Sequence, residues 1–227
     1  MTISPLAPAA FPDLPVIDGV TFAAAAAGVK YANRLDVMLA IMADGTSVAG
    51  VFTTSATRSA NVLDCQRKLA KLSSGPAAII VNSGNSNAFT GKRGDGSVAA
   101  LCKGVSDISG IDEGRIFTAS TGVIGEPLPH DRIIAKLQDL HDTQSSDRLG
   151  NAAQAIMTTD TFAKGSTKTV MINGMPIKIA GIAKGSGMIA PDMATMLVYI
   201  FTDAKIDQAD LQTLVSRKNA VTFNCIT

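Results

Sequence analysis

The sequence KTVMINGMPIKIAGIAKGSGMIAPDMATMLVYIFT, residues 168–202, decides the fold because it carries the strongest strand signals of the chain. Its runs 168–172 and 177–183 flank Asn173-Gly174, a dipeptide that readily takes the positive φ angles of a type I′ turn. A third apolar run, 196–202, is long enough for one buried strand. We therefore expect a hairpin, a glycine-bearing connection and a further strand.

More strands are expected on the N-terminal side of this stretch. The runs Val37–Ile41 and Ser47–Thr53 flank Asp44-Gly45, which is a good hairpin signal. Further strands are expected at Ala77–Val81 and at 115–118, where the second runs into a loop of small residues. The sequence thus supplies strands along most of its length.

Helical patterns alternate with these strands. Apolar residues recur at helical spacing after Gly96 and again over 133–140, and a third helix is expected over 148–157. A short helix opened by Asp207 would turn Leu211, Leu214 and Val215 inward. Mixed strands and helices predict an α/β protein rather than a helical bundle or an all-β sandwich.

Composition narrows the class of partner. The chain has 227 residues, of which 46% are hydrophobic, and a net charge of +1, as suits one large or two small globular domains. No basic stretch predicts nucleic-acid or membrane binding, and the run Ala23–Ala27 is too short to span a bilayer. Without a signal-peptide pattern, and with three scattered cysteines that suit neither a disulfide framework nor a zinc site, we expect a cytoplasmic protein that binds a small molecule.

The connection 184–196 carries the most distinctive chemistry. It places two glycines around Ser186, then a proline, then Ala194-Thr195 directly before the apolar run. A threonine hydroxyl pressed against the preceding carbonyl can convert that amide to an ester, which water hydrolyses. The freed threonine then has its own α-amine as a base, with a reference pKa of about 7.7 to 8. The alternative is an ordinary connection in which Thr195 caps or packs.

A family resemblance favours the first interpretation. The segment KGSGMIAPDMATML (184–197) resembles the self-cleavage motif of the ornithine acetyltransferase family, the bifunctional glutamate N-acetyltransferases of arginine biosynthesis. Further matches follow in order along the chain: AGVFTT (49–54), NSGNSNAFTG (82–91), STGVIG (120–125) and AIMTTDT (155–161). The resemblance covers nearly the whole chain.

The resemblance implies an α/β layered sandwich like that of N-terminal nucleophile hydrolases, self-cleaved into two chains. The α-chain would comprise residues 1–194, and residues 195–227 would begin the β-chain. The pairs of chains would assemble into a larger oligomer. No metal or organic cofactor is implied.

The resemblance also assigns roles. Thr195 would be the nucleophile and a substrate-binding residue, carrying the acetyl group from N-acetylornithine to glutamate by a ping-pong route; whether acetyl-CoA is a further donor stays open. Thr121 and Gly122 would form the oxyanion hole, and Thr158 and Lys184 would bind substrate. From the residues alone, 121–122 would be an ordinary turn, Thr158 a capping hydroxyl and Lys184 a solvated surface lysine.

The chain also departs from the family. Ala163 stands before Lys164 where the family commonly has proline, and VTFNCIT (221–227) resembles an interior segment, so later substrate-binding residues have no positions here. Two rivals stay open: another self-processing threonine amidohydrolase or aminopeptidase, and an inactive or merely oligomerising fragment. For His130 and His141 we expect surface or capping roles, because no G-x-S-x-G motif accompanies them.

Overall fold

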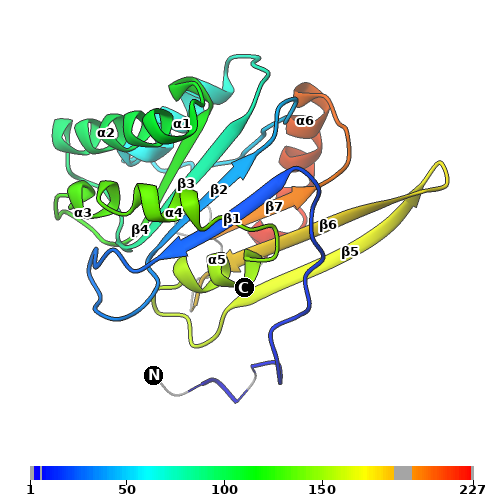
Figure 1. Cartoon of the computed structure of the whole chain (residues 1–227), viewed down its shortest axis with the longest axis horizontal. Helices are drawn as coiled ribbons and strands as arrows, with labels where there is room; N and C mark the ends of the chain where they lie inside the picture. The colour runs from blue at the N-terminus through cyan, green and yellow to red at the C-terminus, as the bar shows by residue number, and fades with distance from the viewer. Residues whose placement is uncertain (1–2, 6, 187–195, 226–227) are drawn as a thin grey trace.

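A computed structural model describes residues 3–5, 7–186 and 196–225 (Figure 1). Four strands form the first sheet in the order β1-β2-β3-β4. They are β1 (Val20–Ala25), β2 (Val37–Met42), β3 (Ala77–Asn85) and β4 (Ile116–Val123). The first three pair antiparallel, whereas β3 and β4 run parallel, so their carboxyl ends meet at one edge of the sheet.

The second sheet contains residues 164–184 and 197–202. It consists of β5 (Lys164–Ile172), β6 (Met175–Lys184) and β7 (Leu197–Thr202), all antiparallel in that order. Asn173 and Gly174 have φ angles of 50° and 79°, so the predicted hairpin turn is confirmed. Lys184 pairs with Leu197, which brings the two described flanks of the 187–195 segment side by side.

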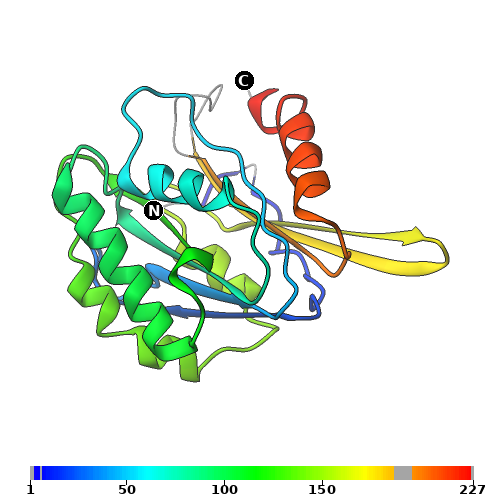
Figure 2. The same cartoon turned by 90° about the horizontal axis from the view of Figure 1, so that it is seen from above.

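Helices cover one face of the first sheet. A buried apolar cluster joins the sheet to α2 (Lys92–Ser109), α3 (His130–Ile134) and α4 (Leu137–Asp142). Helix α1 (Ala60–Leu69) packs along β4 and against α2, as Figure 2 shows from above. Single-turn helices lie at Glu113–Arg115 and Phe223–Cys225.

A second buried cluster fills the space between the two sheets. Helix α5 (Leu149–Ala155) supplies Leu149 and three alanine positions to it. Phe22 of β1 and Phe201 of β7 meet edge to face there, with ring centroids 4.9 Å apart. The chain is therefore a layered α/β sandwich, as expected.

One strand prediction was wrong, and one strand was missed. Ser47–Thr53 is not a strand, so the predicted hairpin across Asp44-Gly45 does not form. Strand β2 already has neighbours on both edges, and Gly50 instead exchanges backbone hydrogen bonds with the Gln212 side chain. The alanine-rich β1, weighed only as a membrane span, is the real partner of β2.

Two helix predictions also need correction. The helix expected over 133–140 is divided into α3 and α4. Helix α6 (Gln208–Asn219) does begin after Asp207, but it buries no residue, and Leu214 is 47% exposed rather than inward. Each helix in the described ranges lacks either the length or the continuous apolar surface that a membrane span requires.

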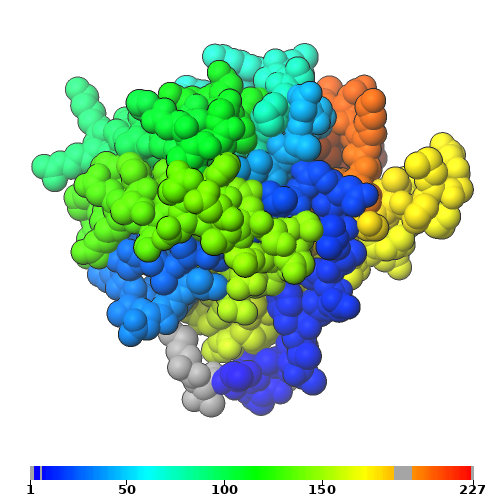
Figure 3. All heavy atoms as spheres, viewed as in Figure 1, coloured from blue at the N-terminus to red at the C-terminus, as the bar shows by residue number. Residues whose placement is uncertain are grey.

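The β5–β6 hairpin extends away from the rest of the molecule. Figure 3 shows its tip as a yellow lobe standing off from the packed layers. Met171, Ile172 and Met175 at this tip are exposed. The other end of the hairpin enters the interior between the sheets, and there the polar residues of interest gather.

Candidate active site

The carboxyl ends of β3 and β4 are held together by buried polar side chains. Ser120 Oγ donates to Asn82 Oδ1 at 2.7 Å, and Asn82 Nδ2 donates to the Asn85 carbonyl at 2.9 Å. Asn85 Nδ2 in turn donates to the carbonyl of Glu126 at 3.0 Å. These bonds fix the neighbouring backbone where the motifs NSGN and STG lie side by side.

Gly122 sits where the two strands approach most closely. It has φ +138°, and a Cβ placed on it would lie 2.3 Å from the backbone carbon of Gly84 and 2.6 Å from the nitrogen of Asn85. Backbone cannot move aside as a flexible side chain can. Only glycine fits this position, and it lies inside β4 rather than in the loop expected from the sequence.

Thr121 and Lys184 meet in the interior between the sheets. Lys184 Nζ donates to Thr121 Oγ1 at 3.2 Å, and the two residues are 4% and 1% exposed for lysine and threonine respectively. Burial lowers the pKa of Lys184, and the nearby Lys164 ammonium lowers it further, against the opposing effect of Asp160. Lys184 is thus a buried amine, not the solvated surface lysine of the alternative interpretation.

Asp160 connects the remaining elements of the site. Its Oδ1 accepts from Gly185 N at 2.8 Å and from Lys164 Nζ at 2.6 Å, and its Oδ2 accepts from Thr158 N at 3.2 Å. Burial alone would raise the pKa of this carboxyl, but these three hydrogen bonds and the Lys164 charge hold it below its ordinary value. Asp160 is therefore ionised at neutral pH.

The charges of this cluster do not balance. Lys164 and Lys184 bring two ammonium groups to one carboxylate, that of Asp160. In the part of the chain that the structure describes, no ion pair joins Lys184 to a carboxylate. A buried region with an excess positive charge favours an anionic ligand.

A further polar group lies beside Thr121. Ser83 pairs with Thr121 in the parallel ladder, so their side chains point to the same face of the sheet. Ser83 is fully buried, and its Oγ finds no hydrogen-bond partner among the residues described. An unpartnered buried hydroxyl is costly, and a site for a ligand explains it.

The structure thus gathers four of the predicted site residues. Thr121, Gly122, Lys184 and Thr158 are linked through the Lys184–Thr121 bond and through Asp160, which also holds the amide that follows Lys184. Thr158 does not cap a helix; it follows α5 and is buried. The predicted cleavage residues Ala194 and Thr195 lie outside the described residues, whose nearest flanks are Ser186 and Met196.

Sequence reasoning missed two members of this cluster. Asp160 lies within the quoted motif AIMTTDT, and Ser83 within NSGNSNAFTG, but neither was singled out. An aspartate between two threonines in an otherwise apolar surrounding could have signalled a buried carboxylate. Nothing in the sequence shows that Ser83 lacks a partner, because that depends on the pairing of β3 with β4.

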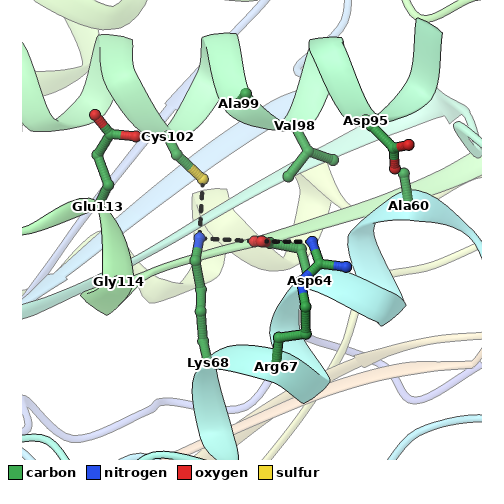
Figure 4. A pocket seen from close by; sticks show the side chains of 10 residues that line it. All are labelled: Ala60, Asp64, Arg67, Lys68, Asp95, Val98, Ala99, Cys102, Glu113 and Gly114. Carbon is green, nitrogen blue, oxygen red and sulfur yellow. Dashed lines mark hydrogen bonds and ion pairs between the residues drawn. The ribbon is translucent and has the colours of Figure 1, made fainter. Parts of the chain in front are cut away.

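A second polar cluster lies between α1 and α2, around a cleft of about 220 Å³. Figure 4 shows Lys68 at its centre: the Nζ atom lies 2.7 Å from Asp64 Oδ2 and donates to Cys102 Sγ at 3.2 Å. The same atom also donates to the Ile116 carbonyl at 2.7 Å. Burial raises the pKa of the Cys102 thiol, so it is not an activated nucleophile. Arg67 also lies 3.2 Å from Asp64, so Lys68 itself is fully partnered, whereas Asp95 and Glu113 line the cleft with no ion pair to these described residues.

Other candidate chemistry is weak within the described ranges. No group of three or more histidine, cysteine or acidic side chains there is placed to hold a metal ion. His130 Nδ1 lies 3.0 Å from Ser97 Oγ at the start of α3, and His141 lies near the end of α4. Both histidines thus lie at helix ends and are half-buried.

Comparisons with known proteins agree with this geometry. The ArgJ family matches residues 21–227. The arginine biosynthesis bifunctional protein ArgJ of Ruegeria pomeroyi is 67% identical over 225 residues, covering 99% of this chain and 55% of that protein. The protein of the same name from Agrobacterium fabrum is 50% identical over 228 residues, covering 100% and 54%. The chain spans about half the length of the curated relatives it matches.

Solved structures extend the comparison to the fold. The arginine biosynthesis bifunctional protein argJ of Bacillus halodurans matches with a TM-score of 0.70 and 31% identity, over 80% of this chain and 92% of that one. Ornithine acetyltransferase of Mycobacterium tuberculosis, complexed with ornithine, matches with a TM-score of 0.65 and 29% identity, over 80% and 94%. An L-aminopeptidase D-Ala-esterase/amidase of Ochrobactrum anthropi, a variant of the Ntn hydrolase fold, matches with a TM-score of 0.52 and 13% identity over 97% and 72%, which shows likeness of fold alone.

Proposed function

The chain belongs to the ArgJ family, and from that premise we propose that it carries the nucleophile of an acetyltransferase that moves the acetyl group of N-acetylornithine to glutamate. The buried Lys184 carries the proposal: its ammonium has no carboxylate partner in the described ranges and lies beside Thr121. Both substrates are amino acids with a carboxylate. An uncompensated buried cation suits that group.

Self-cleavage would prepare the nucleophile. Thr195 Oγ attacks the carbonyl carbon of Ala194, the amide C–N bond breaks and an ester forms. Water then hydrolyses the ester, leaving a carboxylate on Ala194 and a free α-amine on Thr195. The amine takes the proton of the hydroxyl in each later step, which solves the difficulty that an alcohol is a poor nucleophile at neutral pH.

The lengths of the matched chains support a cut of this kind. About half of each curated relative is covered, whereas the two solved ArgJ-type chains are covered to 92% and 94% by four fifths of this chain. Those solved chains are therefore shorter than the present one. An α-chain corresponding to residues 1–194 would have this property.

Transfer would then proceed in two balanced halves. Thr195 Oγ attacks the acetyl carbon of N-acetylornithine, and ornithine leaves with the proton on its amine. The amine of glutamate next attacks the acetyl ester, and the Thr195 hydroxyl is restored as N-acetylglutamate departs. Thr121 and Gly122 would donate to the oxygen that becomes negative in each tetrahedral intermediate, while Thr158 and Lys184 would hold the substrate.

The wider arrangement follows from the same proposal. Acetyl-CoA would serve as a second acetyl donor, which would let the enzyme begin acetylation as well as recycle the group. The two chains would stay paired in the cytoplasm and assemble into a larger oligomer. The reaction as written needs no metal or organic cofactor.

Intact-mass measurement with N-terminal sequencing tests the nucleophile. The freshly purified chain should release a species of about 3 to 4 kDa that begins at Thr195, and the Thr195→Ala variant should not. An uncut wild-type chain, when a longer version that includes the remaining half of the family length cleaves, would mean that this chain alone is an inactive fragment. Absence of cleavage in both would refute the Thr195 assignment.

An acceptor assay separates transfer from hydrolysis. Ornithine release from N-acetylornithine should depend on added glutamate and should be matched by formation of N-acetylglutamate. Equal release without glutamate, with acetate as the product, would instead indicate an amidohydrolase that hands its acyl group to water.

A further inference from the structure

Asp160 links three segments that the proposed reaction needs together. It lies in the loop between α5 and β5, and its side chain is fully buried. One carboxylate accepts the amide of Thr158, the amide of Gly185 and the ammonium of Lys164. No other carboxylate in the described ranges has hydrogen bonds to both the threonine segment and the residue after Lys184.

The carboxylate is itself held in place. Lys164 lies only four residues after Asp160, donates to Oδ1 at 2.6 Å, and stands over the Phe162 ring with its Nζ 4.6 Å from the centroid. Lys164 also pairs with Ala183 in the β5–β6 ladder. The donor that orients Asp160 is therefore fixed by a strand and a ring, not by a free surface side chain.

The bond to Gly185 has the greatest consequence. Gly185 follows Lys184, where β6 ends, and begins the stretch that leads to Ala194-Thr195. Its amide would otherwise be a donor without a ladder partner, because Leu197 pairs with Lys184 and the β6–β7 register ends there. A charged acceptor at 2.8 Å gives this position one preferred backbone orientation.

We propose that Asp160 is a positioning residue: by holding the amides of Gly185 and Thr158 it sets the geometry from which the Ala194-Thr195 bond is cleaved and in which Lys184 and Thr158 receive substrate. The inference rests on the proposed function. It extends that function by a residue that touches no reacting atom. Attack within a chain depends steeply on alignment, and a misplacement of about 1 Å costs roughly a hundredfold in rate.

The test compares Asp160→Asn with a matched control. Asp107 also pairs with a lysine four positions away, Lys103, but on the exposed surface of α2, so Asp107→Asn repeats the chemical change away from the site. In Asp160→Asn the uncharged carboxamide accepts through one oxygen only, and its NH₂ group opposes one of the donors. Self-cleavage of Asp160→Asn, followed by intact mass, should slow at least about tenfold, while Asp107→Asn should match the wild type.

Amide hydrogen exchange, resolved at Gly185, supplies a readout that does not need cleavage. It is measured in the uncut Thr195→Ala background, with global stability followed by thermal unfolding. Protection of the Gly185 amide should fall at least about tenfold in Asp160→Asn, and stay unchanged in Asp107→Asn, at equal global stability. If Asp160→Asn does not fold, Asp160→Glu, which keeps the charge but moves it by one methylene, takes its place.

The outcomes are distinct. Wild-type cleavage rate or unchanged Gly185 protection in the Asp160 variant overturns the positioning role. Loss of protection only at Gly185 and Thr158, with slowed cleavage, supports it. If even the wild-type chain stays uncut, the proposed function fails for this chain, and the exchange result alone decides whether Asp160 holds the segment.

Discussion

The two largely buried lysines, Lys184 and Lys68, differ in the one property that matters for ligand binding. Lys68 lies between α1 and α2 with Asp64, Cys102 and the Ile116 carbonyl as partners. Lys184 lies between the sheets with a threonine hydroxyl as its hydrogen-bond partner and another ammonium nearby. Burial pushes the pKa of both downward, but at Lys68 the carboxylate and thiol outweigh it and raise the pKa, whereas at Lys184 it stays lowered.

This contrast separates a structural ion pair from a binding group. The Lys68 cleft is the more obvious hollow, but Lys68 already has a carboxylate, a thiol and a carbonyl as partners, so an anionic ligand would have to displace existing bonds. The Lys184 region holds an uncompensated positive charge and the buried Ser83 hydroxyl, which has no partner among the described residues. The end of β4 is fixed there by the close contact of Gly122 with the backbone of β3. A buried cation without a carboxylate partner therefore indicates the site better than open volume does.

The largest expected effect is the loss of activity when Lys184 is replaced by methionine, with the same replacement at Lys68 as the comparison. Lys184→Met should lower glutamate-dependent ornithine release by roughly thirty- to a thousandfold, because a carboxylate bound by a buried ammonium loses about 2 to 4 kcal/mol with its partner. Its stability to urea should hold or improve, since an unpaired buried charge is removed. Lys68→Met should keep the activity.

For stability, the order of the two variants is the opposite: Lys68→Met should be the more damaging change. Lys68→Met leaves Asp64 largely buried with only Arg67 at 3.2 Å, so the free energy of unfolding should fall by about 1 to 3 kcal/mol. Equal losses of activity in the two variants, or a stability loss confined to Lys184→Met, would contradict the distinction between the two lysines.

Two glycines test whether the strand ends are as rigid as the contacts suggest. Gly122→Ala should lower the free energy of unfolding by about 2 to 5 kcal/mol, because the new methyl meets the backbone of Gly84 and Asn85 at a φ that disfavours side chains. Gly96 lies at an exposed position of α2, and a Cβ added there has no neighbour within 4 Å. Gly96→Ala should therefore raise the free energy of unfolding by about 0.5 to 1 kcal/mol. Urea unfolding measures both.

A Gly122→Ala protein as stable as the wild type would mean that the two strands separate there at little cost. Thr121 would then not be held where Lys184 needs it. Similar changes in both glycine variants would show that helix propensity and not backbone contact dominates.

The sequence predicted those parts of the fold that depend on local signals. The β5–β6 turn needs only the tendency of Asn173-Gly174 toward positive φ, and α2 needs only its helical period. The Ser47–Thr53 strand was mispredicted because strand pairing depends on residues far apart in the sequence: β2 pairs with β1 instead. Asp44-Gly45 still forms a turn, with Gly45 at φ +81°, but no strand follows it.

The site divides in the same way. Thr121, Gly122, Thr158 and Lys184 could be named from the sequence because a motif resemblance points to residues without geometry; the structure brings them together, and their roles stay predictions. Asp160 and Ser83 could not, because their importance depends on contacts far along the chain: Gly185 for the first, and the lack of a partner among the described residues for the second. Burial of charge is a property of the packed sheets, not of the motif.

Alkaline pH should give the smallest but most direct test, because the two lysines contribute to stability with opposite signs. The native pKa of Lys184 is below the ordinary 10.5, so between these two values the unfolded chain binds more protons than the folded chain. The destabilising effect of the buried Lys184 charge therefore decreases as pH rises. Lys164 and Asp160 face it there. The native pKa of Lys68, facing Asp64 and Cys102, is above 10.5, so its contribution is complete below that pH and is lost as pH rises through the native value. Unfolding free energies are measured from about pH 8 to about pH 11.5. The free energy of the wild type should rise relative to that of Lys184→Met up to the ordinary lysine pKa. Relative to that of Lys68→Met, it should fall only above that pH. Parallel curves for the two variants would show that both ammonium groups are equally well compensated by their surroundings. Lys184 would then not be an uncompensated charge.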